Sequence, residues 1–206
     1  MLTVPRILNR IYAKVQDDVS KKGAFSQWLF NRGVSSKQYY LKNQGAFKHG
    51  MYDKLIFDKV KAKFGGRLRI LVTGSAPIAP EIMDFFKIAL GLHVYDLYGQ
   101  TESAIVSLTM PQDPNSGHSG GVIAGTKCRL KDLPELGYYS TDKPYPRGEL
   151  QFTGCHIIKG YFNNEEKTKD LFDEEGWVNS GDVAMVFPNG SIKVFDRAKN
   201  IFKLSQ

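Results

Sequence analysis

The stretch from Ile70 to Leu97 constrains the fold of this chain more than any other. It begins with a short, continuous apolar run over residues 70–72, which is typical of a buried parallel strand. Pro80 is followed by apolar residues at helical spacing up to Gly91, as expected when proline begins a helix and glycine ends it. A second apolar run, with polar residues between its members, leads to Leu97. This order of strand, loop, helix and strand predicts an α/β fold, in which ligands bind beyond the carboxyl ends of the strands.

Each of these predicted strands ends in a loop whose residues suit a nucleotide. The first loop, Gly74-Ser75-Ala76-Pro77, has small residues against which a flat ligand could lie. The second, Tyr98-Gly99-Gln100-Thr101-Glu102, carries a ring that can stack on a base, a hydroxyl for a phosphate oxygen and a carboxylate for Mg²⁺. The alternative for each loop alone is an ordinary turn, with Glu102 solvated. Because both loops follow strands, we expect them to line one crevice.

The composition is that of a globular chain. Of its 206 residues, 42% are hydrophobic and 24% are charged, which is enough to bury a sizeable core. No apolar run approaches the ~20 residues that cross a bilayer, and the first residues lack the apolar segment of a signal peptide. Cys128 and Cys155 are too few for a disulfide framework and indicate a reducing compartment.

The net charge of +7 is unevenly distributed along the chain. Residues 1–70 contain 15 Lys or Arg and 4 Asp or Glu, whereas residues 71–206 contain 13 and 17. The basic first third could meet anionic lipid, phosphate groups or nucleic acid. Its lysines are dispersed, however, and this favours a solvated helical surface. We therefore expect no nucleic-acid partner.

The first third is predicted to be largely helical. Apolar residues at helical spacing predict helices over Val4–Val15, Ala24–Phe30 and Leu55–Phe64. A polar patch with several glycines, Asn31–His49, follows the second of these helices. The aromatic residues of these segments are expected in the core rather than in a ligand pocket.

Short strands separated by turn residues are predicted in the last third. Pro188-Asn189-Gly190 is a strong hairpin signal, and Asn164–Phe172 is predicted to be a helix with acidic residues at its start. From Val122 on, these elements predict a small antiparallel or barrel unit. Its expected strands are Thr126–Leu130, Gly148–Phe152, Val183–Phe187 and Ser191–Phe195, and a further strand is expected over Ala104–Met110.

Two charged motifs flank the predicted hairpin. Gly176-Trp177-Val178-Asn179-Ser180-Gly181-Asp182 sets a carboxylate beside glycine, where it can accept two hydrogen bonds from a vicinal diol such as a ribose. Asp196-Arg197-Ala198-Lys199 offers a guanidinium fork to phosphate or ribose oxygens. Taken singly, each motif is better explained as a surface charge at a turn. His118, in a glycine-rich loop, has no paired carboxylate near it in the sequence and is expected to be incidental.

Taken in this order, the four motifs resemble those of the adenylate-forming enzymes: Gly74 to Pro77, Tyr98 to Glu102, Gly176 to Asp182, and Asp196 to Lys199. Within that superfamily, other segments resemble the long-chain acyl-CoA synthetases. They are Val4-Pro5-Arg6, residues 71–77, Gly160-Tyr161-Phe162 with Glu166-Lys167-Thr168, and residues 201–206. The resemblance covers nearly the whole chain and is densest from Ile70 on.

The resemblance implies part of the large N-terminal domain of an adenylate-forming enzyme, with a parallel sheet and helices followed by a small β-barrel-like subdomain. The expected bounds are residues 1–121 for a partial α/β subdomain with a helical N-terminal third and 122–195 for the small β-rich subdomain. Residues 196–206 would begin a hinge to a C-terminal lid domain that this chain is expected to lack.

The resemblance also implies a ligase that uses ATP, Mg²⁺ and CoA. A fatty acid carboxylate attacks the α-phosphate of ATP, and the thiol of CoA then displaces AMP from the acyl-adenylate. Thr101 and Glu102 would be catalytic, the first on the α-phosphate and the second on Mg²⁺. The nucleotide would be bound by Gly74, Ser75, Ala76, Pro77, Tyr98, Gly99, Gln100, Thr101, Asp182 and Arg197, with Tyr98 on adenine and Asp182 on the ribose, and Lys199 would be the hinge residue.

Two parts of that machinery have no match in the sequence. The family has a Ser/Thr/Gly-rich loop ending in Lys that cradles the outer phosphates, and a lid domain with a further Lys. We therefore expect a fragment that is inactive alone and binds AMP or ATP at most. The alternatives are a catalytically inactive AMP/ATP-binding or interaction protein derived from the family, and another kind of adenylate-forming enzyme.

The expected partners follow from the same resemblance. Fatty acid, ATP and CoA would be the small-molecule substrates. The full-length protein is expected to associate with the cytosolic face of an intracellular membrane, at the endoplasmic reticulum, the mitochondrial outer membrane or the peroxisome. No anchor or targeting segment is expected within this chain.

Overall fold

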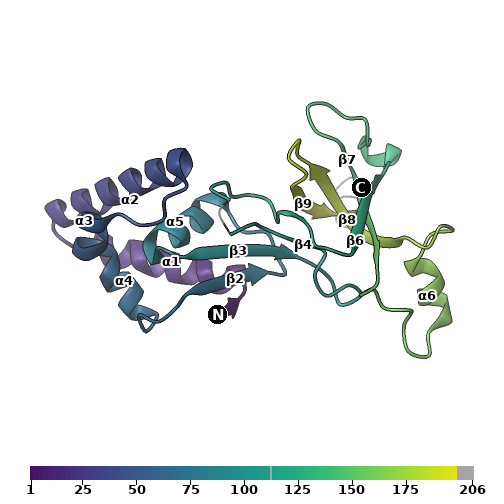
Figure 1. Ribbon diagram of the computed structural model, residues 1–206, viewed down its shortest axis with the longest axis horizontal. Coiled ribbons are helices and arrows are strands. Elements are labelled where there is room, and N and C mark those ends of the chain that lie inside the picture. Colours follow the sequence, from purple (N-terminus) through teal and green to yellow (C-terminus); the bar gives the residue numbers. More distant parts are fainter. Residues whose placement is uncertain (112, 199–206) are drawn as a thin grey trace. The chain divides into compact units, whose positions relative to one another are not determined.

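The computed structural model describes residues 1–111 and 113–198, and these pack as two compact units (Figure 1). Unit 1 comprises Met1–Asp96 and Met110–Gly117, and unit 2 comprises Leu97–Thr109 and the described residues from His118 on. The domain bounds expected at residues 121 and 195 stay a prediction. Lys199, the predicted hinge residue, lies outside the described residues.

The predicted order of strand, loop, helix and strand is confirmed. β2 (Ile70–Gly74) leads into α5 (Pro80–Leu90), which leads into β3 (His93–Tyr98). Pro80 begins α5, and Gly91 ends it with a left-handed φ of 60°. β1 (Leu2–Thr3) pairs in parallel with β2, and β3 borders β2 on the other side.

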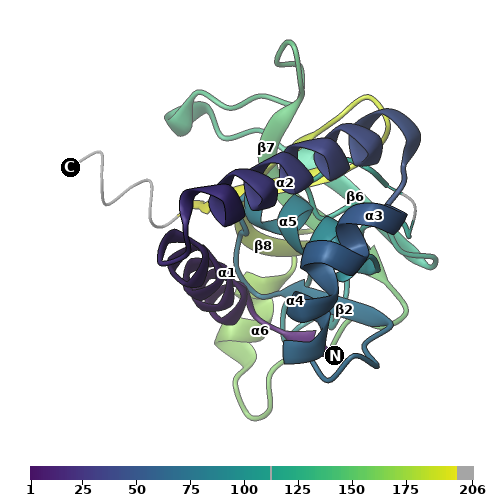
Figure 2. The same cartoon turned by 90° about the vertical axis from the view of Figure 1, so that its left-hand side faces the viewer.

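α5 lies at the centre of the hydrophobic core of unit 1. Every residue from Met83 to Leu90 is buried. Figure 2 shows α1 (Pro5–Ser20), α2 (Ala24–Gln44) and α4 (Asp58–Lys63) packed around it. The Tyr12 ring meets the Phe85 ring edge-on at 5.0 Å between centroids. The core joins residues from all these helices and from the strands: Leu8, Val15, Phe30, Phe57, Val60, Leu71, Phe85, Phe86 and Val94.

α2 extends well beyond the predicted end at Phe30, to Gln44, so most of the polar patch is helical. The reason is that its buried positions are not marked by apolar residues. Gly33 faces the core because a Cβ there would lie 2.8 Å from the Ile56 side chain, and Lys37 is only 1% exposed. Glycine and lysine in a core-facing stripe conceal the helical period. Gly45, with φ of 63°, ends the helix.

The segment predicted as a helix over Leu55–Phe64 consists of three pieces, α3 (Gly50–Tyr52), a π-helical turn η1 (Asp53–Phe57) and α4. The π turn places Asp53 against the buried Lys37. The Lys37 ammonium donates to Asp53 Oδ1 and to the Ile88 carbonyl, and it lies 4.7 Å from the centroid of the Phe57 ring. The His49 amide donates to Asp53 Oδ2 at 2.9 Å.

Burial and the ion pair act in opposite directions on both pKa values. Burial lowers the pKa of Lys37, although Asp53 opposes that effect. Burial acts to raise the pKa of Asp53, but the hydrogen bonds from Lys37 and from the His49 amide outweigh it and leave that pKa lowered. The pair links α2, η1 and the end of α5.

Unit 2 begins with the last two residues of β3. Tyr98 pairs with Ser107 of β4 (Ser107–Leu108), and β4 pairs with β5 (Gly121–Val122). Both pairings are antiparallel, so the sheet is mixed rather than wholly parallel. The strand predicted over Ala104–Met110 is only two residues long. Ala104, with φ of 55°, belongs to a turn and cannot join it.

The rest of unit 2 is built on a four-stranded antiparallel sheet, and the predicted small β unit is thereby found. The strand order is β6 (Thr126–Lys131), β7 (Arg147–Gly154), β8 (Val178–Val186) and β9 (Ile192–Arg197). The hairpin turn closes with the Phe187 amide donating to the Ser191 carbonyl at 2.9 Å. Asn164 is the N-cap of α6 (Glu165–Leu171), and its side chain accepts from the Lys167 amide. A short 3₁₀ turn, η2 (Pro134–Leu136), lies between β6 and β7.

Two small apolar clusters support this sheet. One contains Val106, Phe152, Leu171 and Val178, and the other contains Leu150, Ala184 and Ile192. The Tyr98 ring packs against both clusters. Among the described residues, no helix is both long enough and apolar enough to span a bilayer.

Candidate functional site

The tight turn after β3 fixes the direction of the polar residues that follow Tyr98. A Cβ on Gly99 would lie 1.8 Å from the Ala104 carbonyl oxygen, so only glycine fits there. The Val106 amide donates to the Tyr98 carbonyl at 2.8 Å and closes the turn. Within it, the Gln100 amide donates to Ser103 Oγ at 3.2 Å. The role of Gly99 is therefore steric.

Four predicted site residues of unit 2 meet in one hydrogen-bonded group, which we call the Asp182 cluster: Tyr98, Gln100, Asp182 and Arg197. The Tyr98 hydroxyl and Gln100 Nε2 each donate to Asp182 Oδ2 at 2.7 Å. Gln100 Nε2 also lies 3.2 Å from the Tyr98 hydroxyl. Arg197 Nε lies 3.4 Å from Asp182 Oδ1, because β8 and β9 pair these two residues directly.

The Asp182 cluster combines a buried carboxylate with an exposed cation. The Asp182 side chain is 7% exposed and that of Arg197 is 71% exposed. Burial, together with the charge of Asp182, raises the pKa of the Tyr98 hydroxyl, which therefore stays protonated as a donor. An ionised carboxylate has about four acceptor positions. Asp182 Oδ2 is held by two donors, which leaves the Oδ1 side, next to Arg197, to face further donors.

The backbone around Asp182 is held in place by neighbouring side chains. The Asp182 amide donates to Ser180 Oγ at 3.0 Å, and the Ser180 carbonyl accepts from Gln100 Nε2 at 2.9 Å. The Gly181 amide donates to the carboxylate of Glu149 at 2.9 Å. Sequence reasoning named Ser180 only as a member of the motif that ends at Asp182. It missed Glu149, because nothing local separates that residue from an ordinary strand residue.

Glu102, the predicted Mg²⁺ ligand, has its own partners. The Tyr161 hydroxyl donates to Glu102 Oε1 at 2.6 Å, and the Ile158 amide donates to the Glu102 carbonyl at 3.0 Å. The bond to Glu102 is the main cause of a raised pKa for Tyr161. Thr101, beside it, is exposed. Sequence reasoning noted Tyr161 only as part of a motif and missed this contact.

The described residues contain no group of three or more His, Cys, Asp or Glu side chains that could hold a metal ion. Magnesium needs fewer protein ligands when substrate phosphates also coordinate it. It is usually bound through one or two carboxylates, with substrate phosphate oxygens and water as the other ligands. The single carboxylate of Glu102 fits that donor set.

The loop Gly74–Pro77 lies in unit 1, at the end of β2. Gly74 is buried, whereas Ser75, Ala76 and Pro77 are exposed. Ser75 has a φ of 72°, which is uncommon for a residue other than glycine and costs about 1–3 kcal/mol. The loop thus presents a strained, solvent-facing backbone. That it shares a crevice with Tyr98 stays a prediction.

His118 has a local structural contact, and the expectation that it is incidental stays a prediction. It is 8% exposed, and its Nδ1 accepts from the Gly120 amide at 3.0 Å. A Cβ on Gly120 would lie 2.0 Å from the Leu108 carbonyl oxygen. The histidine therefore helps to hold a glycine loop that approaches β4 very closely.

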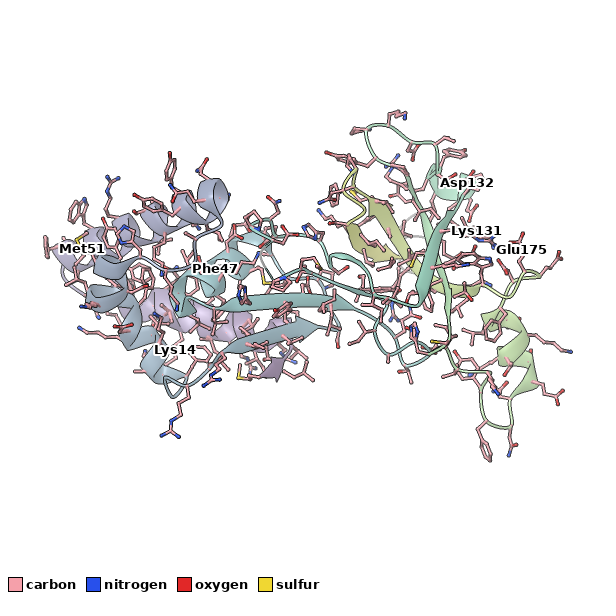
Figure 3. The ribbon with its side chains drawn as sticks, viewed as in Figure 1. Lys14, Phe47, Met51, Lys131, Asp132 and Glu175 are labelled. Carbon is pink, nitrogen blue, oxygen red and sulfur yellow. The ribbon has the colours of Figure 1, made fainter. Side chains whose placement is uncertain are left out.

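A groove of about 640 Å³ in unit 2 contains none of the predicted site residues. The Arg129 guanidinium in its lining bonds to Gln151, Asp173 and Glu175. It also lies 4.6 Å from the centroid of the Trp177 ring. Figure 3 labels Lys131 and Glu175, which line the groove from β6 and from the loop before β8. The polar side chains bonded to Arg129 therefore form a network along part of this groove.

Comparisons with known proteins bear on the whole chain. The model of a family described as AMP-binding enzyme matches residues 1–162. The peroxisomal long chain acyl-CoA synthetase 7 of Arabidopsis thaliana is 41% identical over 205 residues, which are 99% of this chain and 29% of that protein. Long-chain-fatty-acid–CoA ligase 5 of Rattus norvegicus is 38% identical over 205 residues, again 99% and 29%. The chain thus spans about 29% of the length of these curated relatives.

Solved structures with a similar fold include two with a bound adenine nucleotide. The A domain of a carboxylic acid reductase from Segniliparus rugosus, in complex with AMP and a co-purified carboxylic acid, has a TM-score of 0.67 and 30% identity. That match covers 97% of this chain and 27% of that one. ATP-bound MatB from Rhodopseudomonas palustris has a TM-score of 0.56 and 27% identity over 66% of this chain and 27% of that one. The predicted α/β class is confirmed.

Proposed function

This chain belongs to the AMP-binding enzyme family, and from that premise we propose that it supplies the adenosine site of a long-chain fatty acid–CoA ligase. The observation that carries the proposal is the Asp182 cluster. A buried carboxylate is held by Tyr98 and Gln100, and it faces an exposed arginine across the β8–β9 pair. Such a carboxylate is suited to accept two hydrogen bonds from the vicinal hydroxyls of a ribose, and the arginine to contact an adjacent phosphate.

In this proposal the remaining predicted residues complete the nucleotide site. The Tyr98 ring would lie on the adenine, and Gly99 would allow the turn that carries Gln100 and Thr101. The Thr101 hydroxyl would donate to the α-phosphate, and its exposure suits that role. Lys199 would begin the hinge to a lid domain.

The proposed reaction has two displacement steps. In the first, a carboxylate oxygen of the fatty acid forms a bond to the α-phosphorus, and the bond from that phosphorus to the pyrophosphate oxygen breaks. In the second, the sulfur of CoA forms a bond to the acyl carbon, AMP leaves, and the thiol proton goes to a base. A preorganised donor to a developing phosphate charge, as proposed for Thr101, typically contributes about 2.7–4 kcal/mol to transition-state stabilisation.

Magnesium would neutralise charge on the phosphate oxygens when bound. Glu102 is the proposed protein ligand. CoA is proposed as the second substrate because of the resemblance to long-chain acyl-CoA synthetases, and no residue described here is assigned to it.

Membrane contact is the second part of the proposal. The aromatic rings of Phe25 and Trp28 stack on each other on α2, with 5.9 Å between their centroids. They are 73% and 60% exposed, so the expectation that they lie in the core is wrong. Met51, labelled in Figure 3, is a further exposed apolar side chain of unit 1, at 56%. Lysines and arginines surround these residues in the sequence, as at surfaces that meet anionic lipid. Sedimentation with phosphatidylserine vesicles that does not change in Trp28→Ala would contradict this part.

Assays of the natural protein, purified from its source, test the ligase proposal. With palmitate, ATP, Mg²⁺ and CoA we expect AMP and palmitoyl-CoA to form in equal amounts, as followed by chromatography. AMP released without a thioester would indicate another kind of adenylate-forming enzyme. A protein that binds AMP but releases none with any carboxylate would be a nucleotide-binding protein without this activity. Either outcome would overturn the ligase proposal.

A further inference from the structure

One short segment of unit 2 contacts Glu102 twice, once at its backbone and once at its side chain. The Ile158 amide donates to the Glu102 carbonyl at 3.0 Å, and three residues later the Tyr161 hydroxyl donates to Glu102 Oε1 at 2.6 Å. The two contacts act at different ends of the same residue. Together they fix both the position of Glu102 in the turn and the direction of its carboxylate.

The segment that makes these contacts is itself held at both of its ends. Ile157 and Ile158 pack against the apolar cluster that contains Val106 and Phe152. At the other end, the Tyr161 amide donates to Thr168 Oγ1 at 2.9 Å, and that hydroxyl donates to the Asn164 carbonyl at 2.7 Å.

Gly160 lets the segment lie against the first turns of α6. A Cβ there would approach the Thr168 side chain to 2.6 Å. Tyr161 is therefore placed by α6 and by the core, rather than by a free loop. Its hydroxyl is a fixed donor, although the side chain lies at the surface.

We propose that Tyr161 is a positioning residue that orients the Glu102 carboxylate for the metal ion of a bound nucleotide. The inference rests on the proposed function, since it concerns the residue that would hold Mg²⁺ there. With Oε1 held by the hydroxyl, the other carboxylate oxygen has a restricted set of directions. Hydrogen bonds to the ligating side chain are a common way in which proteins orient metal ligands, and their loss typically weakens metal affinity about 10–100-fold.

The test measures nucleotide binding rather than turnover. Calorimetry on the 206-residue chain gives the affinity for ATP at saturating Mg²⁺ and for AMP without metal. Tyr161→Phe keeps the ring and removes only the hydroxyl. We expect it to weaken Mg·ATP binding about tenfold, the lower end of the 10–100-fold range. Its affinity for AMP should stay within about twofold of the wild type. Tyr139→Phe removes a hydroxyl from another exposed tyrosine of unit 2 and should change neither affinity.

A double-mutant cycle separates positioning from a general structural effect. If Tyr161 acts through Glu102, Tyr161→Phe should have no further effect on Mg·ATP affinity in the Glu102→Gln background. Equal losses for AMP and Mg·ATP, an unchanged Mg·ATP affinity in Tyr161→Phe, or an equal loss in both backgrounds would each overturn the inference and leave the adenosine site standing. If the wild-type chain binds neither nucleotide, the proposed function fails, and the inference fails with it.

Discussion

Replacing Asp182 with alanine is expected to weaken AMP binding by at least about 100-fold. In our account this carboxylate accepts both ribose hydroxyls, and a hydrogen bond to a charged group contributes about 1.5–3 kcal/mol. Two such bonds amount to roughly 3 kcal/mol or more, and ~1.4 kcal/mol corresponds to a factor of ten in affinity. Calorimetric titration of AMP into the wild-type and Asp182→Ala chains measures the ratio.

Two control variants make this experiment specific. Asp182→Asn keeps the shape and one acceptor oxygen and should lose less affinity than Asp182→Ala. Asp170→Ala removes an exposed carboxylate of α6, outside the Asp182 cluster, and should bind AMP as the wild type does. Because Asp182 also holds Tyr98 and Gln100, each variant is compared by circular dichroism. A folded Asp182→Ala chain with wild-type affinity would remove Asp182 from the proposed site.

The second large effect is expected in unit 1, at the buried ion pair of Lys37 and Asp53. Asp53→Ala should lower the free energy of unfolding by about 3–5 kcal/mol, the usual cost of leaving a buried charge without its partner. Lys37 would keep the Ile88 carbonyl and the Phe57 ring but lose its counter-ion. Urea denaturation followed at 222 nm measures the change, because the longest helices, α1, α2 and α5, belong to unit 1.

The matched control removes both charges together. Lys37→Met with Asp53→Leu should be much less destabilised than Asp53→Ala alone, since apolar replacement of a buried ion pair is often neutral. If Asp53→Ala unfolds at the urea concentration of the wild type, then the ion pair contributes little. Apolar contacts, such as those of Phe30 with Phe57 and Phe85, would then hold α2 in place.

Some elements were predictable because the local sequence and the tertiary fold agree. Pro80 and Gly91 bound α5 as expected, and Pro188-Asn189-Gly190 joins β8 to β9. In both cases the residues that end an element have their own backbone preference, so no distant contact is needed to place them.

Other elements could not be predicted because distant contacts decide them. α2 continues past Phe30 because Lys37 finds a carboxylate in η1, 16 residues away in the sequence. From the sequence alone a lysine is expected to be exposed. Lys37 is buried because it is paired with Asp53. The expected strand over Ala104–Met110 is short because the turn at Gly99 extends to Ala104.

The candidate site also combines features that local sequence predicts with features that only distant contacts decide. Sequence motifs identified each of Tyr98, Gln100, Asp182 and Arg197 separately. Their assembly into one cluster depends on the contacts of Tyr98 and Gln100 with Asp182, which lies more than 80 residues away in the sequence. No local pattern reports that the Tyr98 hydroxyl binds Asp182. The contact of Tyr161 with Glu102 was missed for the same reason, since the two residues lie 59 positions apart.

Titration of AMP into the wild-type 206-residue chain, followed by calorimetry, tests the central claim most directly. We predict saturable binding with one AMP per chain, because Tyr98, Gln100, Asp182 and Arg197 all lie within unit 2 and hold one another in place. A chain that is folded by circular dichroism yet takes up no AMP would contradict the account and would show that the Asp182 cluster is a structural network rather than an adenosine site.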